Sequence, residues 1–159
     1  MTVSNTTPLI NFYSIQRLDI LEKLFQRIII PEAVANEIRE KEKRFSGVSE
    51  ILNSSFIEVH KIKNYTFANN LKIDVDDGEA EAIVLSIELE IRLIILDELS
   101  ARSLCKYHNL YALGSIGCLV LAKEKDIISS IRPFLDGFRE KGNFWIKESL
   151  YESILKIYE

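Results

Sequence analysis

The stretch LIILDELSAR, residues 93–102, decides the fold class of this chain. Its first four residues are apolar without polar alternation, which is the pattern of a strand buried on both faces of a parallel sheet. Asp97 and Glu98 follow directly, and a helical pattern begins near Ser100. Acids that follow such a strand lie at its carboxyl end, which is the edge where open α/β sheets bind their ligands.

The same order of strand and helix recurs along the chain. Short apolar runs predict six strands, at Thr2–Ser4, Arg27–Ile30, Phe56–Val59, Leu93–Leu96, Tyr111–Leu113 and Phe144–Ile146. Helical spacing separates them, most clearly at residues 18–25, 31–40, 79–90, 99–108 and 117–125. Residues 41–72 predict two helices around a short edge strand. We therefore expect an α/β fold with three α/β/α layers around a central, mostly parallel sheet.

Size and charge narrow the class of protein. The 159 residues favour one domain, and the net charge of −4 argues against a general nucleic-acid coat protein. An enzyme that acts on nucleic acid stays open, because carboxylates that hold a divalent metal make a chain acidic. Cys105 and Cys118 have neither redox nor zinc spacing and are expected to be buried thiols. Neither a membrane-spanning stretch nor a signal peptide is evident, so we expect a cytoplasmic protein with no membrane partner.

Polar residues recur at equivalent places in this strand–helix pattern. They are Asn5 after the first strand, Glu37 on the helix after the second, Glu79 at the start of the long buried helix, and Asp97 with Glu98. In a parallel sheet the strand ends and the following helix starts share one edge, so we expect these side chains to gather there. Gathered carboxylates repel one another unless cations neutralise them, and oxygen ligands suit Mg²⁺ or Mn²⁺. With an acidic metal-bound water, such a cluster would hydrolyse phosphodiesters.

Each acid also has a purely structural explanation. The sequence DDGE, residues 76–79, fits a capping box in which Asp76 caps the helix and Glu79 reaches back to its amide. Glu37 has polar neighbours and could be solvated, and Asp97 with Glu98 could cap the next helix. The sequence leaves these alternatives open.

Four stretches in this order resemble PIN-domain proteins. VSNTTPLI (3–10), PEAVANEI (31–38), GEAEAIVLS (78–86) and LIILDELSAR (93–102) resemble the regions that carry the four acids of that family. The tail, residues 113–155, is similar to one PIN-like branch in which a helix, a short strand segment and a final helix follow the domain. The resemblance implies a single PIN-like domain over residues 1–159, with 126–159 as a C-terminal extension packed on it.

The resemblance implies a metal-dependent endoribonuclease that cleaves RNA with Mg²⁺ or Mn²⁺. Many members are VapC-like toxins of toxin–antitoxin pairs, so a homodimer and a small antitoxin protein are the expected partners besides RNA. Carried over by position, the catalytic and metal-binding acids are Glu37, Glu79 and Asp97, with Glu98 as an auxiliary acid. Asn5 stands in the place of the first acid. Thr6 and Ser115 match small hydroxyl residues near the substrate.

Asn5 and the basic residues leave the function open. Asn5 could bind metal weakly or through water, or it could hydrogen-bond the turn backbone at Thr6 and Thr7. Arg102 and Lys106, four residues apart on the helix after Asp97, share a face that could meet phosphates. The alternative to a nuclease is a weakened or inactive PIN-like module that binds RNA or protein. A regulatory partner role, with the apolar face of the last helix as a contact surface, is a third hypothesis.

Overall fold

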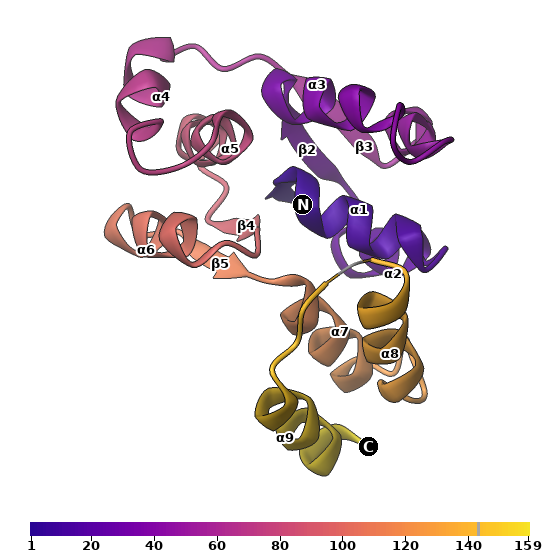
Figure 1. The fold of residues 1–159 in the computed structure, drawn as a ribbon. Helices are drawn as coiled ribbons and strands as arrows, with labels where there is room; N and C mark the ends of the chain where they lie inside the picture. The colour runs from indigo at the N-terminus through magenta and orange to yellow at the C-terminus, as the bar shows by residue number, and fades with distance from the viewer. Residues whose placement is uncertain (143) are drawn as a thin grey trace.

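Five strands form one sheet in the computed structural model, which describes residues 1–142 and 144–159. The strands are β1 (Thr2–Ser4), β2 (Ile28–Pro31), β3 (Ile57–His60), β4 (Leu93–Ile95) and β5 (Tyr111–Leu113). Their order is β3-β2-β1-β4-β5, and every pair is parallel (Figure 1). The order reverses between β1 and β4, so the carboxyl ends of these neighbours flank a topological switch point.

Helices connect the strands and cover both faces of the sheet. They are α1 (Thr6–Ser14), α2 (Leu18–Phe25), α3 (Glu32–Lys41), the 3₁₀ helix η1 (Val48–Asn53), α4 (Tyr65–Leu71), α5 (Asp77–Glu88), α6 (Leu99–Tyr107), α7 (Ser115–Glu124), α8 (Arg132–Glu140) and α9 (Glu148–Tyr158). α4, α5 and α6 pack on one face, and α1, α2, α3 and α7 pack on the other (Figure 1). The expected three-layer α/β/α fold is confirmed.

The continuous apolar runs are explained by burial on both faces of the sheet. Ile28 and Ile30 of β2 belong to the core beneath α1 and α2, whereas Ile29 belongs to the core beneath α5. In β4, Ile94 and Ile95 divide between the two cores in the same way. β2 and β4 therefore have no solvated face, which is why their sequences do not alternate between apolar and polar residues.

One strand prediction was wrong, and some helix boundaries moved. Phe144–Ile146 pairs with no strand in the part of the chain that the structure describes. Pro31, expected as the first helical residue, ends β2 and precedes α3. α5 begins two residues before Glu79 because Asp76 is its N-cap. Between residues 41 and 72, η1 and α4 flank β3 as the sequence predicted.

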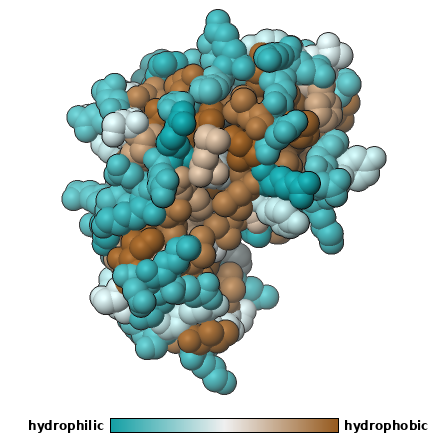
Figure 2. Space-filling model, turned by 180° about the vertical axis from the view of Figure 1, so that it is seen from behind, coloured by the Kyte–Doolittle hydropathy of each residue, from teal (hydrophilic) through white to brown (hydrophobic). Residues whose placement is uncertain are grey.

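The C-terminal helices pack against the same hydrophobic core as α1. Phe138 of α8 is fully buried, and its ring meets Phe12 edge-on at 5.2 Å. The Arg139 guanidinium lies 3.9 Å from the ring centre of Tyr151 on α9. α7, α8 and α9 gather at the end away from α3 and α4 (Figure 1), and apolar side chains continue into this lobe on the opposite face (Figure 2). None of the described helices has the length and apolar character to cross a membrane.

The Phe12–Phe138 contact gives a stability test. We expect Phe138→Ala to lower the free energy of unfolding by about 3–5 kcal/mol, because it leaves a cavity between α1 and α8. Ile73→Ala, at a side chain that is 84% exposed, should change it by less than about 0.5 kcal/mol. Urea unfolding followed by circular dichroism measures both. A loss below about 1 kcal/mol for Phe138→Ala would contradict this packing.

Candidate active site

The polar residues after β1 and β4 lie at one edge of the sheet. β1 and β4 pair in parallel with Ser4 beside Ile95. The backbone N–H of Asn5 donates a hydrogen bond to the backbone carbonyl of Ile95, with 2.9 Å between nitrogen and oxygen. Asn5 is the residue after β1, and Asp97 stands two residues beyond Ile95. The sequence prediction that both reach the carboxyl edge is therefore correct.

Glu37 is held over this edge by α1 and α5. The Thr6 hydroxyl donates to one Glu37 carboxylate oxygen, and the Gly78 amide donates to the other at 3.0 Å. A Cβ at position 78 would lie 2.6 Å from both oxygens, so a larger residue there would displace the carboxylate. Glu37 is therefore an anchored side chain, and the alternative of a solvated residue is wrong.

Glu79 belongs to the capping box that begins α5. The Asp76 carboxylate accepts from the Glu79 amide at 2.8 Å, and Glu79 Oε2 accepts from the Asp76 amide at 3.1 Å. This structural prediction is confirmed, but it does not exclude a functional role. Glu79 is buried, and its cap uses Oε2 alone.

Asp97 caps the start of α7 and not the start of α6, the helix that follows it in the sequence. Its Oδ1 accepts from the Ser115 amide at 2.7 Å, and its Oδ2 accepts from the Ser115 hydroxyl at 2.7 Å. Asn11 of α1 donates to Ser115 Oγ at 3.1 Å and more weakly to Asp97 at 3.4 Å. Glu98, the N-cap of α6, makes no side-chain capping bond. The prediction that Asp97 and Glu98 cap α6 is therefore wrong.

Asn5 carries a buried oxygen without a partner. The residue is 2% exposed, and its Oδ1 accepts no hydrogen bond from any described residue. It makes no side-chain capping bond to α1 either, so the predicted bond to the Thr6–Thr7 turn is wrong. A buried carbonyl oxygen without a donor is costly, and a bound cation or water would satisfy it.

Burial and like charges make the acids of this edge hard to ionise together. Burial raises the pKa of Glu37, Glu79 and Asp97, although hydrogen bonds from Thr6 and Ser115 oppose the shift at Glu37 and Asp97. For Glu79, the charges of Asp76, Glu98 and Glu37 also raise the pKa. Glu79 is therefore repelled by Asp76, Glu98 and Glu37, and Asp97 is repelled by Glu98, so a bound cation would relieve this repulsion.

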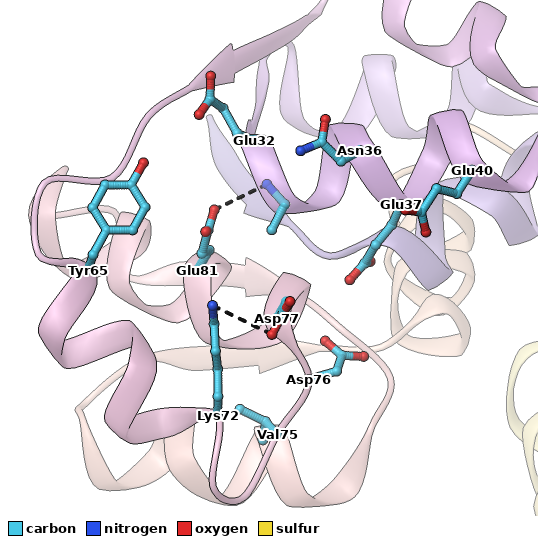
Figure 3. A pocket seen from close by; sticks show the side chains of 11 residues that line it. Glu32, Asn36, Glu37, Glu40, Tyr65, Lys72, Val75, Asp76, Asp77 and Glu81 are labelled. Carbon is cyan, nitrogen blue, oxygen red and sulfur yellow. Dashed lines mark hydrogen bonds and ion pairs between the residues drawn. The ribbon is translucent and has the colours of Figure 1, made fainter.

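Three adjoining pockets that share lining residues lie along this edge, and together they are called the groove. The first includes Glu37 and shares Lys72, Val75 and Asp76 with the second. The second includes Glu79 and shares Thr7 and Glu98 with the third, which includes Asp97 and Arg102. Figure 3 shows the first pocket, where carboxylates of α3 and α5 face one another across the opening. Glu81 points into it but accepts from the Ala33 amide at 3.1 Å, which commits one of its oxygens to the start of α3.

The other sequence-predicted residues fall on both sides of the groove wall. Thr6 and Ser115 are buried behind it, where they orient Glu37 and Asp97. Arg102 lines it, and its charge lowers the pKa of Asp97 against the larger effect of burial. Lys106 is exposed and lines none of the three pockets.

Two residues that orient the acids were missed by sequence analysis. Asn11 lies on an otherwise apolar helix face, and its partner Ser115 is 104 positions away. Gly78 is explained by its contact with Glu37, 41 positions away. A polar residue on an apolar face and a glycine inside a helix start are the signals that could have indicated them.

The donor set fits a hydrated divalent cation. No three carboxylate, histidine or cysteine side chains of residues 1–142 and 144–159 converge closely enough to hold a metal ion by themselves. Mg²⁺, however, commonly keeps several waters and takes only one or two carboxylates directly. Glu37, Glu79 and Asp97 supply oxygen ligands and negative charge at this edge, and Asn5, at the same edge, has an unpartnered side-chain oxygen. That chemistry suits Mg²⁺ or Mn²⁺ in such a mode.

Comparison with known proteins gives one match. The family model DUF3368, which describes a PIN domain, matches residues 1–159. No curated protein and no solved structure matches the chain.

The raised pKa of Glu79 predicts a pH-dependent effect of Glu79→Gln on stability. The folded protein retains a proton on Glu79 that the unfolded chain has released, so stability from this group is present at low pH. It is lost as the pH rises from about 4.5 through the raised folded pKa. Relative to wild type, Glu79→Gln should therefore gain stability between pH 4.5 and pH 7 in chelator. Urea unfolding at both values measures the difference, and a relative loss at pH 7 would contradict the repulsion.

Proposed function

The chain belongs to the PIN-domain family, and we propose that it is a divalent-metal-dependent endoribonuclease of the PIN type. The single observation that supports the proposal is that Glu37, Glu79 and Asp97 line adjoining pockets at the carboxyl edge of the sheet, where Asn5 also lies. Charges of the same sign gathered at such cost are typical of sites that bind cations and perform chemistry.

In this proposal Glu37, Glu79 and Asp97 hold Mg²⁺ or Mn²⁺. Glu98 serves as an auxiliary acid, and Asn5 contributes its amide oxygen weakly or through a water. When bound, the cation supplies an acidic water and stabilises negative charge on a phosphodiester. The chain's own contribution is orientation, because Thr6 and Gly78 fix Glu37 while Ser115 and Asn11 fix Asp97.

Basic residues beside the acids would position the RNA backbone. Arg102 reaches the groove next to Asp97 and can meet a phosphate that lies over the acids. Lys106 follows one turn later on α6, outside the groove, where it would attract the RNA at longer range. No histidine lines the groove in the described part of the chain, so no side-chain base of that type competes with a metal-bound water.

Asn5 favours a second candidate function. A neutral amide in place of an acid leaves the groove with one negative charge fewer than four acids would provide. A PIN-like module with weakened or lost catalysis, which still binds RNA or protein, is consistent with that change. A toxin role with a small antitoxin, and a homodimer, are further proposals that rest on the family alone.

The direct test is cleavage of end-labelled single-stranded RNA in Mn²⁺ by wild type and by Asp97→Asn. We expect cleavage that chelator abolishes and that Asp97→Asn reduces by at least about a hundredfold, because the variant removes a charge that positions the cation. Glu140→Gln, at an exposed acid of α8 far along the chain, is the matched control and should cleave normally. Equal cleavage by Asp97→Asn would overturn the proposal, and metal-independent RNA binding without any cleavage would favour the binding module.

Restoring an acid at position 5 gives a second prediction. Asn5→Asp should lower the Mn²⁺ concentration needed for half-maximal cleavage by about tenfold, because it adds a negative charge beside the cation. In chelator the same variant should be less stable than wild type, and Mn²⁺ should raise its melting temperature more. An unchanged Mn²⁺ requirement together with unchanged stability would place Asn5 outside the reach of the cation.

A further inference from the structure

We propose that Trp145 forms a stacking platform for an unpaired base of a single-stranded RNA whose backbone crosses Asp97. The inference rests on the proposed nuclease function and extends it, since it assigns the side of the groove along which the substrate continues. Trp145 is 82% exposed and lines the same pocket as Asp97 and Arg102. This pocket has a volume of about 660 Å³.

The backbone around Trp145 holds the indole ready for contact. Phe144 packs against Phe138 with the ring centres 5.7 Å apart, and Ile146 is buried in the same core. The Ile146 carbonyl also accepts from the Arg139 guanidinium at 3.3 Å. Phe144 and Ile146 pack on the core, and Trp145 between them is exposed, so two anchored neighbours hold the indole at the surface. In Figure 1 this segment joins α8 to α9 and runs beside α7.

The two end pockets of the groove differ in the charges that line them. The first pocket contains many carboxylates and the single cation Lys72, which lies 3.5 Å from Asp77. The pocket of Trp145 contains Arg102 and Lys147 and, beyond Asp97 and Glu98, no further acid among its described residues. A polyanion is repelled by the first pocket, whereas the two cations of the Trp145 pocket offset the charges of Asp97 and Glu98. A strand that presents a phosphate at Asp97 therefore continues toward Trp145.

The exposed apolar side chains of this pocket would make more favourable contacts with RNA bases than with the RNA sugar–phosphate backbone. Leu99, which is 79% exposed, and Leu150 line the pocket with Trp145. Aromatic rings bind single strands by stacking on any base, while nearby cations hold the phosphates. An apolar protein partner would also cover these side chains, but it would leave Arg102 and Lys147 without a use. The combination of indole and two cations beside the acids favours RNA.

Fluorescence tests the platform without requiring cleavage, because Trp145 is the sole tryptophan of the chain. The experiment titrates Asp97→Asn protein in chelator with a hexamer of riboadenylate and with an abasic hexamer of equal length. We expect the riboadenylate to quench the indole fluorescence and the abasic oligomer to leave it unchanged. Equal quenching by both, or none by either, would overturn the proposal.

Affinity for labelled riboadenylate, measured by anisotropy, provides the matched comparison. Trp145→Ala should weaken binding about tenfold and Trp145→Phe much less, since a factor of this size lies within the range that stacking on one base contributes. Tyr107→Ala removes an aromatic ring that is 81% exposed outside the groove and should leave affinity unchanged. If Trp145→Ala instead dissociates a dimer and leaves RNA affinity unchanged, the surface is a protein interface and the proposal fails.

The outcome is separable from that of the nuclease proposal. If wild type does not cleave RNA but its indole is quenched by bases, the platform stands and the nuclease function fails. If wild type cleaves and Trp145→Ala leaves KM and kcat unchanged, the nuclease function stands and the platform fails.

Discussion

The candidate site depends on the hydrogen bonds that hold partly buried carboxylates in place at one edge of the sheet. Glu37 lies on α3, Glu79 lies on α5 and Asp97 follows β4, and each accepts hydrogen bonds that fix its position. The donors come from Thr6, the Asp76 and Gly78 amides, and Ser115, so neighbouring elements hold the acids in place. Hydrogen bonds that hold several carboxylates close together are typical of a catalytic or cation-binding site.

The fold was predictable because the central strands β1, β2 and β4 have no exposed face. The runs RIII and LIIL have no polar face, and only a parallel sheet covered by helices explains that pattern. The sixth predicted strand, Phe144–Ile146, shows where such reasoning fails. Phe144 and Ile146 pack on the core while Trp145 is exposed, and tertiary packing rather than pairing with the sheet accounts for this burial. A short apolar run in the sequence indicates that side chains are buried, but it does not identify the element that buries them.

The acids of the site were also predictable, whereas their supports were not. Strand ends and helix starts can be read from local pattern, and these locate Asn5, Glu79 and Asp97. The contacts that orient them join positions 41 or 104 residues apart, as with Gly78 to Glu37 and Asn11 to Ser115. The missing partner of Asn5 Oδ1 likewise depends on the whole fold. Local sequence can therefore indicate which residues carry charge, but the three-dimensional structure decides how they are held.

The central claim is that the acids act together on one cation, and Mn²⁺ binding measured by electron paramagnetic resonance tests it most directly. Free Mn²⁺ gives a sharp signal that disappears on binding, so the titration needs neither RNA nor cleavage. The account predicts saturable binding by wild type and by Glu140→Gln, and weaker binding by Glu37→Gln, Glu79→Gln and Asp97→Asn alike. Equal Mn²⁺ binding by wild type and by the variant that combines all three substitutions would contradict it.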